Sequence, residues 1–136
     1  MLETQLSEVP FFSMLSKKEL AAVARQTDEI DVREGETVAR EGDVGREFFV
    51  IVDGTAEVVR GADRIAELGP GDFFGEMALV GDDRRMATVR ATKAMRVIVM
   101  TRQSFRDLDR SMPKVHATIV DAIEARRASS QPAPAG

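Results

Sequence analysis

The sequence contains no cysteine and a single histidine. The absence of cysteine excludes disulfide bonds, thiolate metal sites and cysteine nucleophiles. A single histidine excludes any metal site that needs two or three imidazole ligands. These two absences narrow the kinds of metal site and catalytic site that the chain can hold.

Long apolar runs are also absent. The longest, Phe48–Val52, is far shorter than the ~20 residues that span a bilayer. The N-terminus is acidic and lacks the basic end and the apolar stretch of a signal peptide. The sequence therefore predicts a cytoplasmic location without membrane contact.

Basic charge is in deficit, because 19 Lys and Arg residues stand against 23 Asp and Glu residues, which gives a net charge of −4. Nucleic-acid binders usually carry a basic excess, so DNA is not expected as a partner. The length of 136 residues is that of one domain. We predict that this domain covers residues 1–128 and that residues 129–136 form a disordered, Ala- and Pro-rich tail.

Both ends of the predicted domain have helical patterns. In residues 1–27, Ser16 and Glu19 have the spacing of a capping box. From Arg102 onwards apolar residues recur every three or four positions, and Pro113 stands where a new helix can begin. An apolar cluster around Pro10 must pack against the region that follows; it consists of Val9, Phe11, Phe12, Met14 and Leu15.

Residues 28–101 have the pattern of short strands separated by glycine turns. Their spacing of roughly eight to twelve residues predicts an all-β barrel or sandwich. The segment from Phe74 to Val80 differs, because it contains helix formers. The predicted strands are Ile30–Val32, Thr37–Ala39, Phe48–Val52, Glu57–Arg60, Arg64–Leu68, Thr88–Ala91 and Arg96–Met100.

The segment from Gly71 to Ala91 has the components of an anion site. Gly75 permits close approach of the backbone and opens a short helical turn, whose free amides favour negative charge. The planar guanidinium of Arg85 suits two phosphate oxygens at once. Glu76 would repel a bare anion, but it can accept a hydrogen bond from a neighbouring sugar hydroxyl.

Phe74-Gly75-Glu76-Met77-Ala78-Leu79 and Arg85-Met86-Ala87-Thr88-Val89 resemble, in order and spacing, the phosphate-binding cassette of cyclic nucleotide-binding domains. Upstream, Glu41-Gly42-Asp43 followed by Gly45 and Phe48–Gly54 resembles the strand-turn-strand signature of the same family. The resemblance covers roughly residues 7 to 127. It implies a mainly β fold, a double-stranded β-helix (jelly-roll) barrel, with an N-terminal helix and with C-terminal helices that act as a lid.

The resemblance also implies a binding domain with no metal, no organic cofactor and no catalytic residues, and therefore a protein that is not an enzyme. It further implies the ligand and the role of each site residue. The ligand would be cAMP, with cGMP as the alternative, and Arg85 would pair with its exocyclic phosphate oxygens. Glu76 would bind the ribose 2′-hydroxyl. Backbone amides would surround the cyclic phosphate, namely those of Gly75, Glu76, Met77, Ala78, Met86 and Ala87. The base would lie on Val52, Phe74 and Val89, with Ile119 and Ile123 closing over it.

Four functions compete. The first is a cyclic-nucleotide sensor that signals through its C-terminal helices to an effector protein or through self-association. A transcription factor of the catabolite-activator type is set aside, because about 25 residues after the barrel leave no room for a DNA-reading motif. A metal-dependent cupin enzyme would need more than one histidine. A degenerate domain that acts only through protein contacts remains as the alternative.

Overall fold

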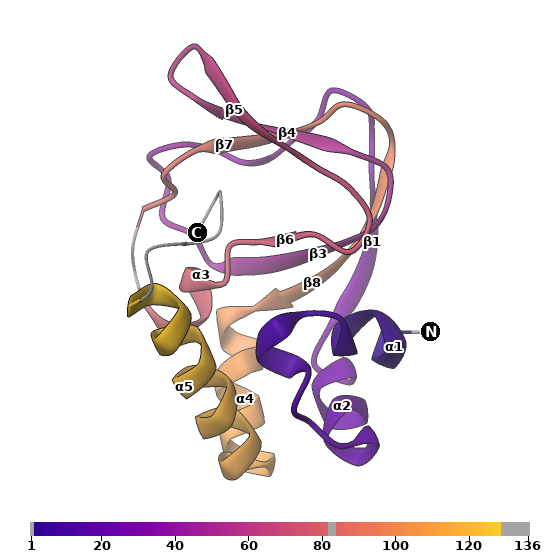
Figure 1. Cartoon of the computed structure of the whole chain (residues 1–136), viewed down its shortest axis with the longest axis vertical. Coiled ribbons are helices and arrows are strands. Elements are labelled where there is room, and N and C mark those ends of the chain that lie inside the picture. Colours follow the sequence, from indigo (N-terminus) through magenta and orange to yellow (C-terminus); the bar gives the residue numbers. More distant parts are fainter. Residues whose placement is uncertain (1, 82–83, 129–136) are drawn as a thin grey trace.

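The computed structural model describes residues 2–81 and 84–128, which form two β-sheets and a layer of helices (Figure 1). The chain begins with α1 (Leu2–Ser7), the 3-10 helix η1 (Pro10–Phe12) and α2 (Lys17–Ala24). It ends with α4 (Arg102–Ser111) and α5 (Pro113–Ala128). The intervening elements are β1 (Asp28–Val32), β2 (Thr37–Ala39), β3 (Glu47–Asp53), β4 (Ala56–Arg60), β5 (Asp63–Leu68), β6 (Phe73–Phe74), α3 (Met77–Val80), β7 (Thr88–Ala91) and β8 (Met95–Thr101).

The strands pair antiparallel in two four-stranded sheets, with the orders β1-β8-β3-β6 and β2-β7-β4-β5. The prediction of a mainly β fold with flanking helices is confirmed. The predicted closure of the strands into one barrel is not confirmed, because the strands of each sheet are hydrogen-bonded only within that sheet. Side chains fill the space between the sheets, and facing sheets about 10 Å apart cannot share strand hydrogen bonds that need about 4.8 Å.

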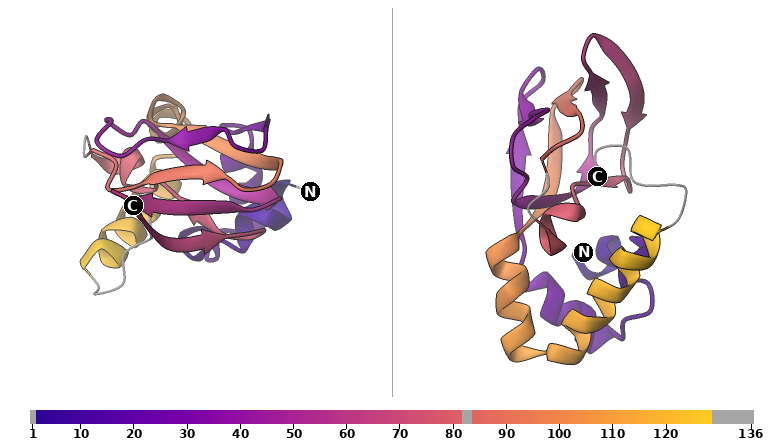
Figure 2. Two further views of the ribbon diagram at one scale, coloured as in Figure 1. Left: turned by 90° about the horizontal axis from the view of Figure 1, so that it is seen from above. Right: turned by 90° about the vertical axis from the view of Figure 1, so that its left-hand side faces the viewer.

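The β1-β8-β3-β6 sheet is the middle layer of the molecule, between the other sheet and the helices (Figures 1 and 2). The side chains of strand β3 explain this middle position, because they contribute to apolar clusters on both faces of the sheet. Its residues Phe48 and Val50 belong to the cluster shared with the helices, whereas Phe49 and Ile51 belong to the cluster between the sheets. Successive side chains of a strand point to opposite faces, so a continuous apolar run such as Phe48–Val52 is buried on both.

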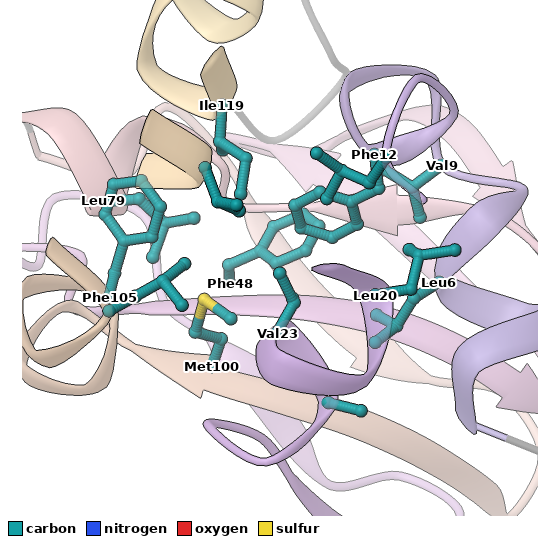
Figure 3. Packing of buried hydrophobic residues seen from close by; sticks show 14 of the residues in the cluster. Leu6, Val9, Phe12, Leu20, Val23, Phe48, Leu79, Met100, Phe105 and Ile119 are labelled. Atoms are coloured by element: carbon teal, nitrogen blue, oxygen red, sulfur yellow. The ribbon is translucent and has the colours of Figure 1, made fainter. Parts of the chain in front are cut away.

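The helix-side cluster joins the two ends of the chain (Figure 3). Phe12 of η1 packs edge-on against Phe48, with ring centroids 6.0 Å apart and planes at 87°. Leu79, Phe105 and Ile119 contribute from α3, α4 and α5 to the same cluster. The N-terminal and C-terminal helices are therefore held together by one apolar core rather than docked separately on the sheet.

The N-terminal region differs from the predicted continuous helical character over residues 1–27. It breaks into α1, η1 and α2, because Pro10 favours the start of a new helical turn and disfavours helix in the residue before it. The capping box is confirmed, since Ser16 and Glu19 exchange side-chain and backbone hydrogen bonds. Met14 is 86% exposed and so lies outside the predicted apolar cluster.

Two further differences concern residues 73–80. Phe73 and Phe74, which the sequence did not predict as strand, form β6 and pair with Val50 and Phe49. The helical turn that was predicted to open at Gly75 begins only at Met77, and Gly75 itself has a φ of +84°, which excludes it from a right-handed helix.

The remaining elements lie close to the predicted ranges, and α5 begins at Pro113. Within residues 2–81 and 84–128, no helix is both long and apolar enough to cross a bilayer. The predicted tail, residues 129–136, lies outside the described residues, so its disorder stays a prediction.

Candidate functional site

The backbone of Arg85 is fixed by the loop that precedes β3. Its N–H donates to the carbonyl of Asp43 at 2.7 Å, and its own carbonyl accepts from the N–H of Gly42 at 2.9 Å. The neighbouring Arg84 forms an isolated bridge with Val44 and donates from its guanidinium to the Gly42 carbonyl at 2.7 Å. Two segments that are about 40 positions apart in the sequence are thus held side by side.

The side chain of Arg85 runs into the protein between two glycines and is only 6% exposed. Its Nη2 donates to the carbonyl of Glu47 at 2.7 Å. A Cβ atom at Gly45 would lie 2.7 Å from Arg85 Nε, and one at Gly75 would lie 2.4 Å from Arg85 Nη1. Both positions therefore need glycine to make room for the guanidinium.

Glu76 lies between Gly75 and the first residue of α3, and it is only 3% exposed. Burying the charges of Arg85 and Glu76 costs desolvation free energy unless the two charges compensate one another. Burial lowers the pKa of Arg85 from its ordinary value, and the carboxylates of Glu47 and Glu76 act in the opposite direction. The site is thus a desolvated cation with acidic residues beside it.

The predicted ring of backbone amides is brought together in part. Gly75 to Ala78 form the turn that enters α3, and Met86 and Ala87 follow Arg85. However, the N–H of Ala78 already donates to the carbonyl of Gly75 at 3.0 Å, so in this conformation it is engaged within the turn. Met86 is 59% exposed, whereas Ala87 is fully buried.

The three residues predicted to contact the base lie on two different faces of the middle sheet. Phe74 and Val89 are fully buried in the cluster between the sheets, where Phe74 stacks on Phe49 with ring centroids 4.8 Å apart. Val52 packs against the helix-side cluster instead. The structure thus brings Phe74 and Val89 together and leaves Val52 on the other face, as the alternation along β3 requires.

The two residues predicted to close over the base are fully buried core residues in this conformation. Ile119 and Ile123 of α5 belong to the helix-side cluster, and Figure 3 shows Ile119 pointing toward Leu79 and Phe48. Contact with a base at the site of Arg85 would require α5 to move out of this packing. Their role as a lid stays a prediction.

Two contributors to the site were missed by the sequence analysis. Gly45 lies in the quoted motif, and its clash distance to Arg85 explains why a glycine stands there. The carbonyl of Glu47 has no signal in the sequence, because every residue has a carbonyl.

Arg102, the first residue of α4, connects the site with the helices. Its Nε donates to the carbonyl of Ala78 at 2.8 Å, and its Nη2 donates to the carbonyls of Gly45, at 2.9 Å, and Gly81. One side chain thus joins α3 and the Gly45 turn to the beginning of α4.

Among the residues that the structure describes, no group of three or more His, Cys, Asp or Glu side chains has an arrangement that could hold a metal ion. The chemistry that the site offers is therefore that of a guanidinium, a carboxylate and backbone amides. This donor set has the chemistry that suits a small anion which also carries a hydroxyl group.

Comparison with known proteins agrees with this description. The family model described as cyclic nucleotide-binding domain matches residues 29–111, which include both halves of the site. A cAMP-dependent protein kinase regulatory subunit from Schizosaccharomyces pombe is 35% identical over 82% of this chain and 29% of its own length. A cyclic nucleotide-gated potassium channel from Rhizobium etli is 35% identical over 90% of this chain and 34% of its own.

Among solved structures, the Thermus thermophilus catabolite activator protein superposes with a TM-score of 0.74 and 27% sequence identity. The match covers 87% of this chain and 57% of that protein. The chain therefore spans about a third of the two curated relatives and little more than half of this structure.

Proposed function

Because the chain belongs to the cyclic nucleotide-binding domain family, we propose that it is a non-enzymatic sensor that binds cAMP at Glu76 and Arg85. The observation that carries this proposal is the buried guanidinium of Arg85, for which Gly45 and Gly75 leave room. A cyclic phosphate offers two exocyclic oxygens to the guanidinium, and its ribose offers a 2′-hydroxyl to Glu76.

The signal would pass from the cassette to the C-terminal helices. α3 contacts both α4 and α5, and Arg102 bonds to carbonyls on both sides of the site. Nucleotide binding would shift the population toward states in which α5 is repositioned, so that Ile119 and Ile123 cover the base. An effector protein, or a second copy of the chain, would then recognise the new helix position.

The strand orders of the two sheets support the jelly-roll description of the scaffold.

Isothermal titration with cAMP, cGMP and a cyclic dinucleotide tests the proposal. We expect saturable binding of cAMP with one site per chain. The bond from Arg85 to the Glu47 carbonyl favours a second reading, in which the arginine is structural and the domain acts only through protein contacts. Absence of heat with all three ligands would favour that second reading.

Glu76→Gln should reduce the affinity for cAMP about tenfold, because hydrogen bonds to a charged group contribute about 1.5–3 kcal/mol. Affinity for 2′-deoxy-cAMP should barely change, because that ligand lacks the hydroxyl that Glu76 binds. Titration of both ligands into both proteins measures the difference. Equal losses for the two ligands would mean that Glu76 supports the loop and does not bind the ribose.

We also predict that cAMP binds about tenfold more tightly than cGMP. In the family's cGMP-selective members a Thr or Ser directly after the cassette arginine bonds the guanine amino group, and Met86 has no hydroxyl there. Desolvating the guanine edge without a partner costs about 1–3 kcal/mol. Met86→Thr should strengthen cGMP binding, and since Met86 is 59% exposed the change should leave stability unaltered. Competition between the two nucleotides checks both expectations, and equal affinities in the unaltered protein would contradict the first.

A further inference from the structure

Three exposed arginines on the two sheets, Arg64, Arg90 and Arg96, form ion pairs with neighbouring carboxylates. Arg90 Nη2 lies 2.6 Å from Glu57 Oε2, and Arg96 Nη1 lies 3.3 Å from Glu29 Oε2. Arg64 likewise contacts Glu57 and Glu67. Arg60 of β4 is the exception on the sheets, because it donates to the carbonyl of Met86 at 3.2 Å and forms no ion pair within the described residues.

Helix α4 is different. Arg102, Arg106 and Arg110 follow at spacings of four residues, so their side chains lie along one face of the helix. Arg106 and Arg110 are exposed, and neither forms an ion pair with a residue that the structure describes. Arg46, which precedes β3, is likewise exposed and forms no ion pair within residues 2–81 and 84–128.

Helix stability accounts for only one of these arginines, Arg110, which lies in the last turn of α4 and there stabilises the helix dipole. Like charges four residues apart on a helix repel each other, and basic residues in the first turn oppose the helix dipole. No acidic residue occupies the first turn of α4 to offset the effect. A sequence that keeps such an unfavourable pattern on an exposed face commonly does so for a function.

Arg102 and Arg106 border two hollows, and Arg46 borders one of them. One, of about 550 Å³, is lined by Arg46, Glu47, Thr101, Arg102, Gln103 and Arg106. The other, of about 310 Å³, shares Arg102 and Arg106 with the first and includes the apolar residues Val80, Phe105 and Val120. We call Arg46, Arg106 and Arg110, with the two hollows beside them, the α4 basic face.

We propose that the α4 basic face docks an acidic segment of a partner protein. From Arg106 to Arg110 the helix rises about 6 Å at 1.5 Å per residue. In an extended segment, side chains on one side recur about every 6.8 Å, so two successive carboxylates on that side match these two arginines. The smaller hollow, with Val80 and Val120 in its lining, accepts an aliphatic side chain from the same segment.

The surroundings favour an acidic protein segment over a nucleic acid. Glu47 and Glu124 line the hollows, and Asp107 and Asp109 lie on α4 itself. A continuous phosphate backbone would meet these carboxylates as well as the arginines, and affinity for nucleic acid depends mainly on neutralised phosphates. A peptide can place its few carboxylates opposite the arginines alone.

The test uses the full chain and a fluorescein-labelled peptide of glutamate, leucine and glycine, with a glutamine-for-glutamate peptide as the ligand control. The variant is Arg106→Glu with Arg110→Glu, neither of which belongs to the nucleotide site. The matched control is Lys18→Glu with Lys93→Glu, two exposed positions outside α4 that change the net charge equally. Arg102 stays unchanged because it also bonds to Ala78 and Gly45.

Fluorescence anisotropy should show that the glutamate peptide binds the unaltered chain and the lysine control, and binds the arginine variant at least about tenfold more weakly. Thermal melts followed by circular dichroism establish that all three proteins are folded. In spectra of the ¹⁵N-labelled protein, the peptide should shift amide signals of α4. Equal affinity for all three proteins, failure to bind the unaltered chain, shifts confined to other elements, or tighter binding of duplex DNA than of the peptide would each overturn the proposal.

Discussion

Replacing Arg85 with alanine is expected to weaken cAMP binding by at least about 30-fold. Removing one member of a desolvated charge pair costs about 2–5 kcal/mol, and Arg85 is only 6% exposed. Arg85→Lys should recover only part of the affinity, because an ammonium cannot form the two-pronged contact of a guanidinium. Isothermal titration with cAMP measures all three proteins.

Arg84→Ala is the matched control, since it removes a neighbouring arginine whose side chain is exposed and donates to the Gly42 carbonyl. That variant should bind cAMP nearly as the unaltered protein does. A folded Arg85→Ala protein with affinity within about threefold of the original would contradict the assignment of the phosphate site.

Gly75→Ala should lower the free energy of unfolding by about 2 kcal/mol or more and reduce cAMP affinity as strongly as Arg85→Ala does. The φ of +84° is strained for any residue with a side chain. The new Cβ would lie 2.7 Å from the carbonyl oxygen of Glu47, a backbone atom, and 2.4 Å from Arg85 Nη1. Urea unfolding gives the stability change, and titration gives the affinity change.

Gly45→Ala separates these two effects. Its Cβ would meet the Arg85 side chain, with Nε at 2.7 Å and Cζ at 2.8 Å, and that side chain can move without disturbing the fold. Stability should therefore change by less than about 1 kcal/mol while cAMP affinity falls about tenfold. In an Arg85→Ala background the substitution should have no further effect on affinity. Unaltered affinity for the single variant would mean that the present position of Arg85 is not needed for binding.

The strands that the sequence predicted correctly have local signals. β2 and β7 match their predicted ranges, and each contains β-branched residues, namely Thr37 and Val38 in β2 and Thr88 and Val89 in β7. β6 lacks such a signal, since two phenylalanines before a glycine are equally compatible with a helix start. Its assignment as a strand depends on pairing with Val50 and Phe49, some 24 positions away, and no local pattern encodes that contact.

For the candidate site, too, the sequence indicated some of the residues that lie together but not the position of all of them. Arg85, Glu76 and Gly75 stand in a recognisable motif, and the structure places them within one buried region. The placement of Val52 could have been derived from strand alternation, because Phe74 and Val52 contribute to opposite faces of the middle sheet. The burial of Ile119 could not have been derived from the sequence, because it results from the way the N-terminal and C-terminal helices pack together.

The double role of β3 limits how the length of this protein can evolve. Phe48 and Val50 serve one core and Phe49 and Ile51 the other, so inserting or deleting one residue within the strand would exchange the two sets. Each core would then contain the side chains that fit the other core, so neither would pack well. Length can vary instead at Gly61 in the β4–β5 turn, where an added Cβ meets nothing within 4 Å. Insertions in homologous sequences should therefore collect at that hairpin and avoid β3.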